Sequence, residues 1–133
     1  MGFPRRGDIY LVEFDPARGH EIRKTRPALV IQNNIGNRYS PVTIVAAIAS
    51  NLSRVPYPVD VTVLPAKRNG LSAESAIQLG QIRPVDASRL VKRLGALDPA
   101  TMRQVDQAIR DQFWSHPILK ADAAAPKRRN NCN

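Results

Sequence analysis

The runs Ala28-Leu29-Val30-Ile31 and Thr43-Ile44-Val45-Ala46-Ala47-Ile48 are short, continuous and apolar, and the turn-rich stretch NNIGNRYSP (33–41) separates them. Runs of this length with turn residues beside them are typical of strands that are buried on both faces of a sheet. We therefore expect these two segments to form the centre of a β-sheet.

Further strands are expected on both sides of this centre. Residues 8–14, DIYLVEF, are rich in β-branched and aromatic types and stop at an Asp-Pro turn signal. In residues 59–63 three valines alternate with polar residues, which places the valines on one face of a strand. Another strand is expected over residues 76–84. Residues 90–94 fit either a strand or a helical turn, and we favour the strand.

The clearest helix signal begins at Asp98-Pro99. Asp is a favoured N-cap residue, Pro suits the first helical position, and Leu97 can pack against Met102 as a hydrophobic staple. Apolar residues then recur at helical spacing and predict a stripe that faces the core. The members of this stripe are Met102, Val105, Ile109 and Phe113.

Several short strands followed by one amphipathic helix, without regular strand–helix alternation, predict an α+β protein with a small, strongly bent sheet or partial barrel. A doubly wound nucleotide-binding fold is disfavoured. The length of 133 residues corresponds to one domain. We expect this domain to span residues 1–119 and residues 120–133, KADAAAPKRRNNCN, to be a mobile basic tail, because they contain no large apolar side chain.

The charge of the chain favours a polyanionic partner. Lys and Arg number 20 against 11 Asp and Glu, so the net charge is +9, and the isoelectric point is about 10.6. Between Glu21 and Asp60 there is no acidic residue, while five basic residues lie there. Such a stretch suggests a phosphate-binding face. A solvated surface with bound counter-ions is nearly as good an interpretation.

The sequence lacks the residue patterns that usually bind metal ions or nucleotide cofactors. Cys132 is the only cysteine, His20 and His116 are far apart in the sequence, and no metal-ligand spacing or phosphate-binding glycine loop occurs. We therefore expect neither a metal nor a cofactor. No apolar run approaches the roughly 20 residues that span a bilayer, and no secretory signal is visible. These features predict a cytoplasmic protein that does not enter a membrane.

RNA remains a substrate that needs no metal for cleavage, since its own 2′-hydroxyl can act as the nucleophile. Arg26-Pro27 stands where the basic segment 17–27, expected to be a solvent-facing loop, meets the first apolar run. An arginine held there by a rigid strand is suited to clamp a scissile phosphate. The alternative is a structural arginine that closes the strand end or pairs with Glu21.

Seven short motifs lie between about residue 5 and residue 113: RGDIY (6–10), FDP (14–16), GHEI (19–22), KTRPALVIQN (24–33), IGNR (35–38), SP (40–41) and GQIR (80–83). They resemble those of the MazF/PemK toxins and occur in the same order. The resemblance implies the toxin of a toxin–antitoxin pair, with a small, strongly curved SH3-like β-barrel that is shared with CcdB-like toxins and carries a C-terminal amphipathic helix.

The resemblance also implies an activity. Such toxins are homodimers that cleave single-stranded RNA at short sequences without metal and leave a 2′,3′-cyclic phosphate and a 5′-hydroxyl. The partner would be a cognate acidic antitoxin of the MazE type, a segment of which folds over the basic site.

The resemblance assigns roles to individual residues. Arg26, in the RP motif, corresponds to the arginine that acts as acid or base at the phosphate, and Glu21 corresponds to the glutamate of the preceding loop. Family members usually carry a catalytic threonine as Thr-Ser-Asn, where this chain has Ala49-Ser50-Asn51. Ser50 is the candidate for the missing hydroxyl, although neighbouring residues of a strand point to opposite faces. A turn residue at the strand end is an equally good interpretation of Ser50.

The remaining candidates are contacts to RNA. Gln81 and Arg83 match positions that approach bases and phosphates in relatives, with sheet-edge or dimer-interface polarity as the alternative. Tyr57, between two prolines, is able to stack a base, with a structural anchor as the alternative. The full set of expected RNA contacts is His20, Arg23, Lys24, Thr25, Asn51, Tyr57, Gln81 and Arg83.

Two other functions stay open at this point. Because Ala49 replaces the threonine, the chain is also consistent with a relative that binds RNA without cleaving it. A gyrase-binding toxin of the CcdB type is the second alternative, and it is weaker because the loop and RP motifs resemble the RNase branch.

Overall fold

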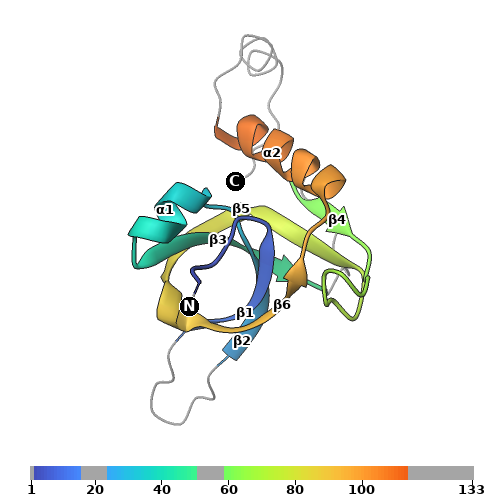
Figure 1. Cartoon of the computed structure of the whole chain (residues 1–133). Coiled ribbons are helices and arrows are strands. Elements are labelled where there is room, and N and C mark those ends of the chain that lie inside the picture. Colours follow the sequence, from blue (N-terminus) through green and yellow to red (C-terminus); the bar gives the residue numbers. More distant parts are fainter. Residues whose placement is uncertain (1, 16–23, 51–58, 114–133) are drawn as a thin grey trace.

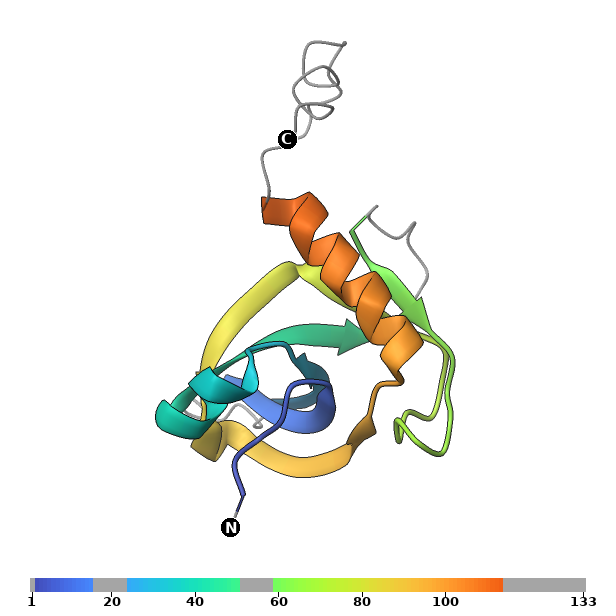
Figure 2. The ribbon, with the colours of Figure 1, turned by 45° about the horizontal axis from the view of Figure 1, so that its top comes forward.

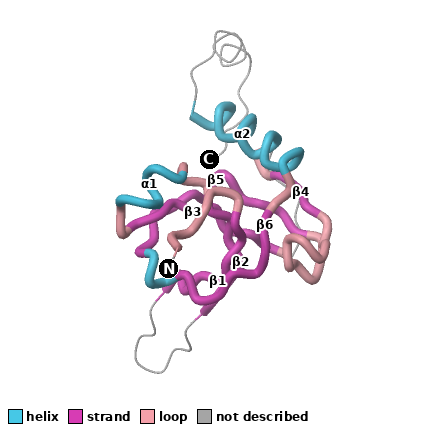
Figure 3. The backbone as a smooth tube through the Cα atoms, viewed as in Figure 1, coloured by secondary structure: helices cyan, strands magenta, loops and turns pink. Residues whose placement is uncertain are grey.

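The computed structural model describes residues 2–15, 24–50 and 59–113. Six strands, two α-helices and a short 3-10 helix lie in these ranges (Figures 1 and 3). In chain order they are β1 (Asp8–Asp15), β2 (Lys24–Val30), α1 (Asn34–Tyr39), β3 (Val42–Ala49), β4 (Val61–Val63), β5 (Ser75–Asp86), the 3-10 helix η1 (Ala87–Arg89), β6 (Leu90–Ala96) and α2 (Pro99–Phe113).

The strands form one antiparallel sheet in the order β4-β5-β3-β2-β1-β6. The two apolar runs of β2 and β3 therefore lie side by side in the middle, as the sequence predicts. The α+β class with a C-terminal helix is confirmed. Within the described residues β4 and β6 are edge strands, so the strand ladders do not close on themselves.

Both faces of the central strands are buried, which confirms the prediction from their continuous apolar runs. Leu29 of β2 belongs to a large cluster that also includes Val105 of α2, and we call it the helix-side cluster. The neighbouring residues of Leu29 point to the other face and join a second cluster. The buried members of this second cluster are Val12, Ala28, Val30, Val45 and Val85.

Strand β5 bends in the middle. Ala46 of β3 pairs with Ile82 and Ile48 pairs with Ile77, so the single residue Ala47 on β3 lies opposite residues 78–81 on β5. Extra residues on one strand bend it and increase its twist, and Figure 2 shows β5 turning a corner there. The bend allows one strand to pair with β4 before the corner and to continue along β3 after it.

Helix α2 begins as its sequence predicts. Asp98 accepts hydrogen bonds from the Thr101 backbone N–H (3.0 Å) and hydroxyl (2.7 Å), and these bonds, the side-chain one first, hold the pKa of Asp98 below its usual value. Met102 packs against the helix-side cluster that contains Leu97. Phe113 was expected in the core stripe, and this is wrong. It is 68% exposed at the last residue of α2, which extends beyond the sheet in Figure 1.

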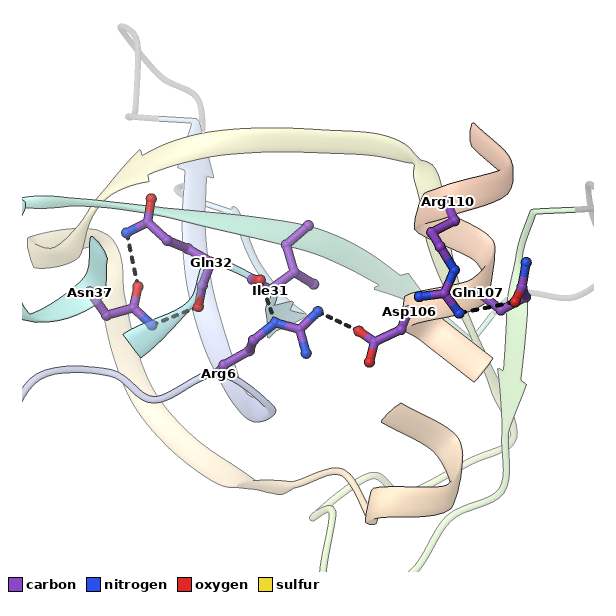
Figure 4. A network of polar contacts seen from close by, with 7 residues as sticks. All are labelled: Arg6, Ile31, Gln32, Asn37, Asp106, Gln107 and Arg110. Atoms are coloured by element: carbon purple, nitrogen blue, oxygen red, sulfur yellow. Dashed lines mark hydrogen bonds and ion pairs between the residues drawn. The ribbon is translucent and has the colours of Figure 1, made fainter. Parts of the chain in front are cut away.

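Helix α1 is not anticipated by the sequence analysis, which assigns its residues to a turn. It forms because the Asn33 side chain accepts a hydrogen bond from the Gly36 N–H (2.8 Å) and because Asn37 is buried within a polar network. Asn37 accepts from the Thr43 hydroxyl (2.6 Å) and from Gln32 Nε2 (3.0 Å), and it donates to the Gln32 carbonyl (2.9 Å; Figure 4). Tertiary bonds thus stabilise a helix too short to be stable alone.

Other boundaries also differ from the sequence-based expectation. Strand β2 begins at Lys24, so the expected loop over residues 17–27 is wrong for its last four residues; pairing with β1 makes them a strand despite their polarity. Residues 90–94 lie in strand β6, the alternative that we favoured. Among the described residues no helix is both long and apolar enough to cross a membrane.

Candidate nucleic-acid interface

Arg26 lies on β2 near the start of the strand and is exposed. Its backbone is opposite Val12 of β1. Because side chains alternate along a strand, Arg26 points to the same side as Ala28, which belongs to the second cluster. Among the described residues none makes a hydrogen bond or ion pair with the Arg26 guanidinium. Arg26 is therefore held by a rigid strand while its charge stays accessible.

Arg83 of β5 reaches the same side of the sheet. It is exposed and opposite Val45 of β3, and its guanidinium carbon lies 4.9 Å from the centre of the Phe14 ring of β1. Phe14 itself packs against the second cluster. A separation below about 6 Å is the range of a cation–π contact. We call Phe14, Arg26, Ala49 and Arg83 the arginine face, since strand alternation also directs Ala49 to this side.

Ser50 lies on the other side of the sheet. It follows β3 directly and lines a cavity of about 280 Å³ together with Pro27 and Ile48, and Ile48 belongs to the helix-side cluster. Arg26 is not among the described residues that line this cavity. The structure thus places Ser50 and Arg26 near the ends of neighbouring strands but does not bring their side chains together on one face.

Two further candidates lie within described strands. Thr25 is exposed and is opposite Glu13 of β1, so alternation directs it away from the arginine face. Gln81 is exposed and lies in the bent part of β5, two residues before Arg83. Gln81 is therefore the expected RNA contact nearest along the chain to Arg83.

The remaining expected site residues cannot be placed by the structure. Glu21, His20, Arg23, Asn51 and Tyr57 lie outside the described residues. Lys24 is the first residue of β2, but its side chain is also outside the described part. Their roles stay predictions.

One residue of the arginine face is missed by the sequence analysis. Phe14 is interpreted there as part of a strand and of the FDP motif, without a role at the site. No local signal links it to Arg83, because the two residues meet through the sheet and not through the sequence. In the described ranges, no group of three or more His, Cys, Asp and Glu side chains is arranged to hold a metal ion.

The chain is similar to several known proteins. The chain is 43% identical over 106 residues to the Bacillus subtilis protein named endoribonuclease EndoA, covering 80% of this chain and 90% of that protein. It is 40% identical over 114 residues to the protein named endoribonuclease MazF of Staphylococcus saprophyticus, covering 86% and 94%. The solved structure described as MazE–MazF (Form-II) from Deinococcus radiodurans is similar with a TM-score of 0.69 at 26% identity, covering 84% and 96%.

The match to a protein family is equally broad. Residues 5–113 match the family described as the PemK-like, MazF-like toxin of type II toxin–antitoxin systems. This range contains every described strand and helix, including the whole arginine face. The chain belongs to this PemK-like, MazF-like toxin family.

Proposed function

We propose that the chain is the toxin of a type II toxin–antitoxin system and cleaves single-stranded RNA as a metal-independent, sequence-specific endoribonuclease. The observation that carries the proposal is Arg26, held at the start of β2 with its guanidinium exposed, in a chain 40% or more identical to two proteins named endoribonucleases. The net charge of +9 supports a polyanionic substrate.

The proposed chemistry uses the RNA as its own nucleophile. The 2′-hydroxyl attacks the neighbouring phosphorus, the bond to the 5′-oxygen breaks, and the products are a 2′,3′-cyclic phosphate and a 5′-hydroxyl. Arg26 stabilises the negative charge that develops on the phosphate oxygens, and in the family pattern it also assists proton transfer to the leaving oxygen. Glu21 is the proposed base for the 2′-hydroxyl proton.

The present chain departs from the family pattern at the position of the catalytic threonine, where it has Ala49. Ala49 has no hydroxyl, and Ser50 faces the cavity beside Pro27. We propose that electrostatic stabilisation by arginine provides most of the rate, with Ser50 as a secondary contributor. Removing one such preorganised donor typically lowers a rate constant by about 100- to 1000-fold.

The same proposal includes the assembly. We propose a homodimer with an SH3-like, CcdB-like curved sheet, acting in the cytoplasm and neutralised by an acidic, MazE-like antitoxin. One structural relative, from Deinococcus radiodurans, is described as a MazE–MazF complex, and the positive charge of this chain suits an acidic partner.

The test is cleavage of a long, unstructured RNA by the purified protein in EDTA, with analysis of the fragment ends. We expect discrete cuts with 2′,3′-cyclic phosphate ends, which Arg26→Ala slows by about 100-fold or more and Ser50→Ala slows less. Arg38→Ala is the matched control, because it removes one exposed positive charge on α1, away from the arginine face. Cuts that form at the wild-type rate in Arg26→Ala would come from another nuclease and would refute the proposal.

Ala49 favours one second candidate, a relative that binds RNA without cutting it. Binding of the same RNA with every strand left intact would support this alternative. A supercoiling assay with gyrase examines the CcdB-like alternative, and unchanged supercoiling would dismiss it.

A further inference from the structure

We propose that Phe14 is a positioning residue for RNA binding: its ring holds the guanidinium of Arg83 on the arginine face, so that Arg83 and Arg26 contact one RNA strand together. This inference rests on the proposed function, which supplies RNA as the ligand, and it adds a residue that none of the motifs above assigns a role.

The Phe14 ring is a firm support. Phe14 packs against the buried second cluster, whose nearest member along β1 is Val12, fully buried. Strand β1 pairs with β6 as far as Val12 and with β2 on both sides of Phe14, at Glu13 and Asp15, so the backbone before and after Phe14 is held in the sheet. The Phe14 ring is half-buried, because part of it packs against the second cluster. The part that stays exposed is available to the guanidinium of Arg83.

Arg83 needs such a support. Its side chain is exposed on β5, and an exposed arginine loses rotamer freedom when it is held in one orientation. The ion pairs between described residues join Arg6 to Asp106 and Arg93 to Asp8, so no described carboxylate orients Arg83. The contact that orders its guanidinium is the one with Phe14, at 4.9 Å from the ring centre.

The register brings this contact beside Arg26. Arg26 is opposite Val12, and Phe14 is two residues further along β1, where the register with β2 shifts. The packing of Phe14 against the second cluster keeps it on the face that Val12 and Arg26 share. Two guanidinium groups from β2 and β5 thus lie on one face although they repel each other. The electron-rich face of the ring offsets part of this repulsion in the free protein, and the phosphates of RNA offset the rest on binding.

The test is binding of a mixed-sequence, fluorescein-labelled 2′-O-methyl RNA, which lacks the nucleophile and stays intact. Phe14→Leu keeps an apolar side chain against the second cluster but removes the ring, whereas Phe14→Tyr keeps the ring. From the usual strength of an exposed cation–π contact we expect Phe14→Leu to raise the Kd about two- to fivefold and Phe14→Tyr to leave it unchanged.

A double-mutant cycle separates positioning from a general loss of structure. Arg83→Gln removes one phosphate-binding charge and lowers the salt slope of binding by about one. In that background Phe14→Leu should have no further effect. An equal effect of Phe14→Leu with and without Arg83 would overturn the proposal, as would an unchanged Kd in Phe14→Leu alone.

Cleavage of ordinary RNA by the wild-type protein is measured in parallel. Intact RNA with the coupled binding result refutes the endoribonuclease but supports the role of Phe14. Cleavage without coupling between Phe14 and Arg83 refutes the role of Phe14 and leaves the endoribonuclease supported.

Discussion

The two ends of β2 each lie beside an arginine, and the two arginines are held in opposite ways. Beyond the C-terminal end, Arg6 Nε donates to the Ile31 carbonyl (2.8 Å) and Arg6 Nη2 to an oxygen of Asp106 on α2 (2.6 Å; Figure 4). Near the N-terminal end, Arg26 is exposed and bonds to none of the described residues. One arginine connects parts of the fold, and the other keeps its charge exposed.

The largest effect that this comparison predicts is on activity. Arg26→Ala should lower the rate of RNA cleavage by about 100-fold or more, because one preorganised cation at the phosphate is lost. Its free energy of unfolding should change by less than about 0.5 kcal/mol, as for other exposed positions. Initial cleavage rates and urea unfolding measure the two quantities. A strongly destabilised Arg26→Ala would mean that Arg26 also has a structural role.

The opposite result is expected at the other end. Arg6→Ala should lower the free energy of unfolding by about 1–3 kcal/mol, since hydrogen bonds to charged groups are lost and the Ile31 carbonyl loses a donor. Cleavage by the folded protein should stay within about twofold, because Arg6 lies outside the arginine face. Arg5→Ala is the matched control, because Arg5 is exposed and its guanidinium lies over the Phe3 ring (5.2 Å), while its hydrogen bonds with Asp8 come from the backbone and are kept in the variant. Equal loss in both variants would contradict the role of Arg6.

A smaller effect is expected in the network that supports α1. Thr43→Val keeps the shape of the side chain but removes the buried hydroxyl that donates to Asn37. Asn37 retains the bond from Gln32, so the loss should be about 1 kcal/mol in unfolding free energy. Thr62→Val, at an exposed position of β4, provides the comparison and should change stability less. Urea unfolding of both variants measures the two losses of unfolding free energy, and a larger loss in Thr62→Val would contradict the role of Thr43.

The smallest effect concerns pH and the start of α2, the helix that carries Asp106. The pKa of Asp98 is lowered from 3.8 in the folded protein by the bonds from Thr101. The stabilisation from its charged form is therefore complete above about pH 4 and is lost as the pH falls through the lower folded value. Asp98→Asn keeps a capping side chain without the charge. The Tm of the wild type should thus fall more steeply below pH 4 than the Tm of Asp98→Asn. Parallel curves of Tm against pH for the two proteins would refute this account.

Burial explains which parts of the fold the sequence predicts. The runs around Leu29 and Val45 indicate central strands because both of their faces are buried, and Asp98-Pro99 indicates a helix start because capping depends on neighbouring residues. Helix α1 is stabilised instead by Thr43 from β3. A local pattern does not contain that contact, so the sequence analysis misses the helix.

The candidate site divides in the same way. Arg26 is found from the sequence because it belongs to a short motif at the start of a strand. Phe14 is not found, because its contact with Arg83 depends on the order of the strands and on the bend of β5. The placement of Ser50 away from the arginine face also follows from strand alternation together with the cavity beside Pro27.

During synthesis β1 is the first strand to leave the ribosome. Its two partners in the sheet, β2 and β6, are made at very different times. It pairs with β2 soon after, but its other edge stays open until β6 has been made. The Phe14–Arg83 contact also waits for β5, and the Arg6–Asp106 pair waits for α2. A nascent chain therefore carries Arg26 early and completes the arginine face only after β5 has been made.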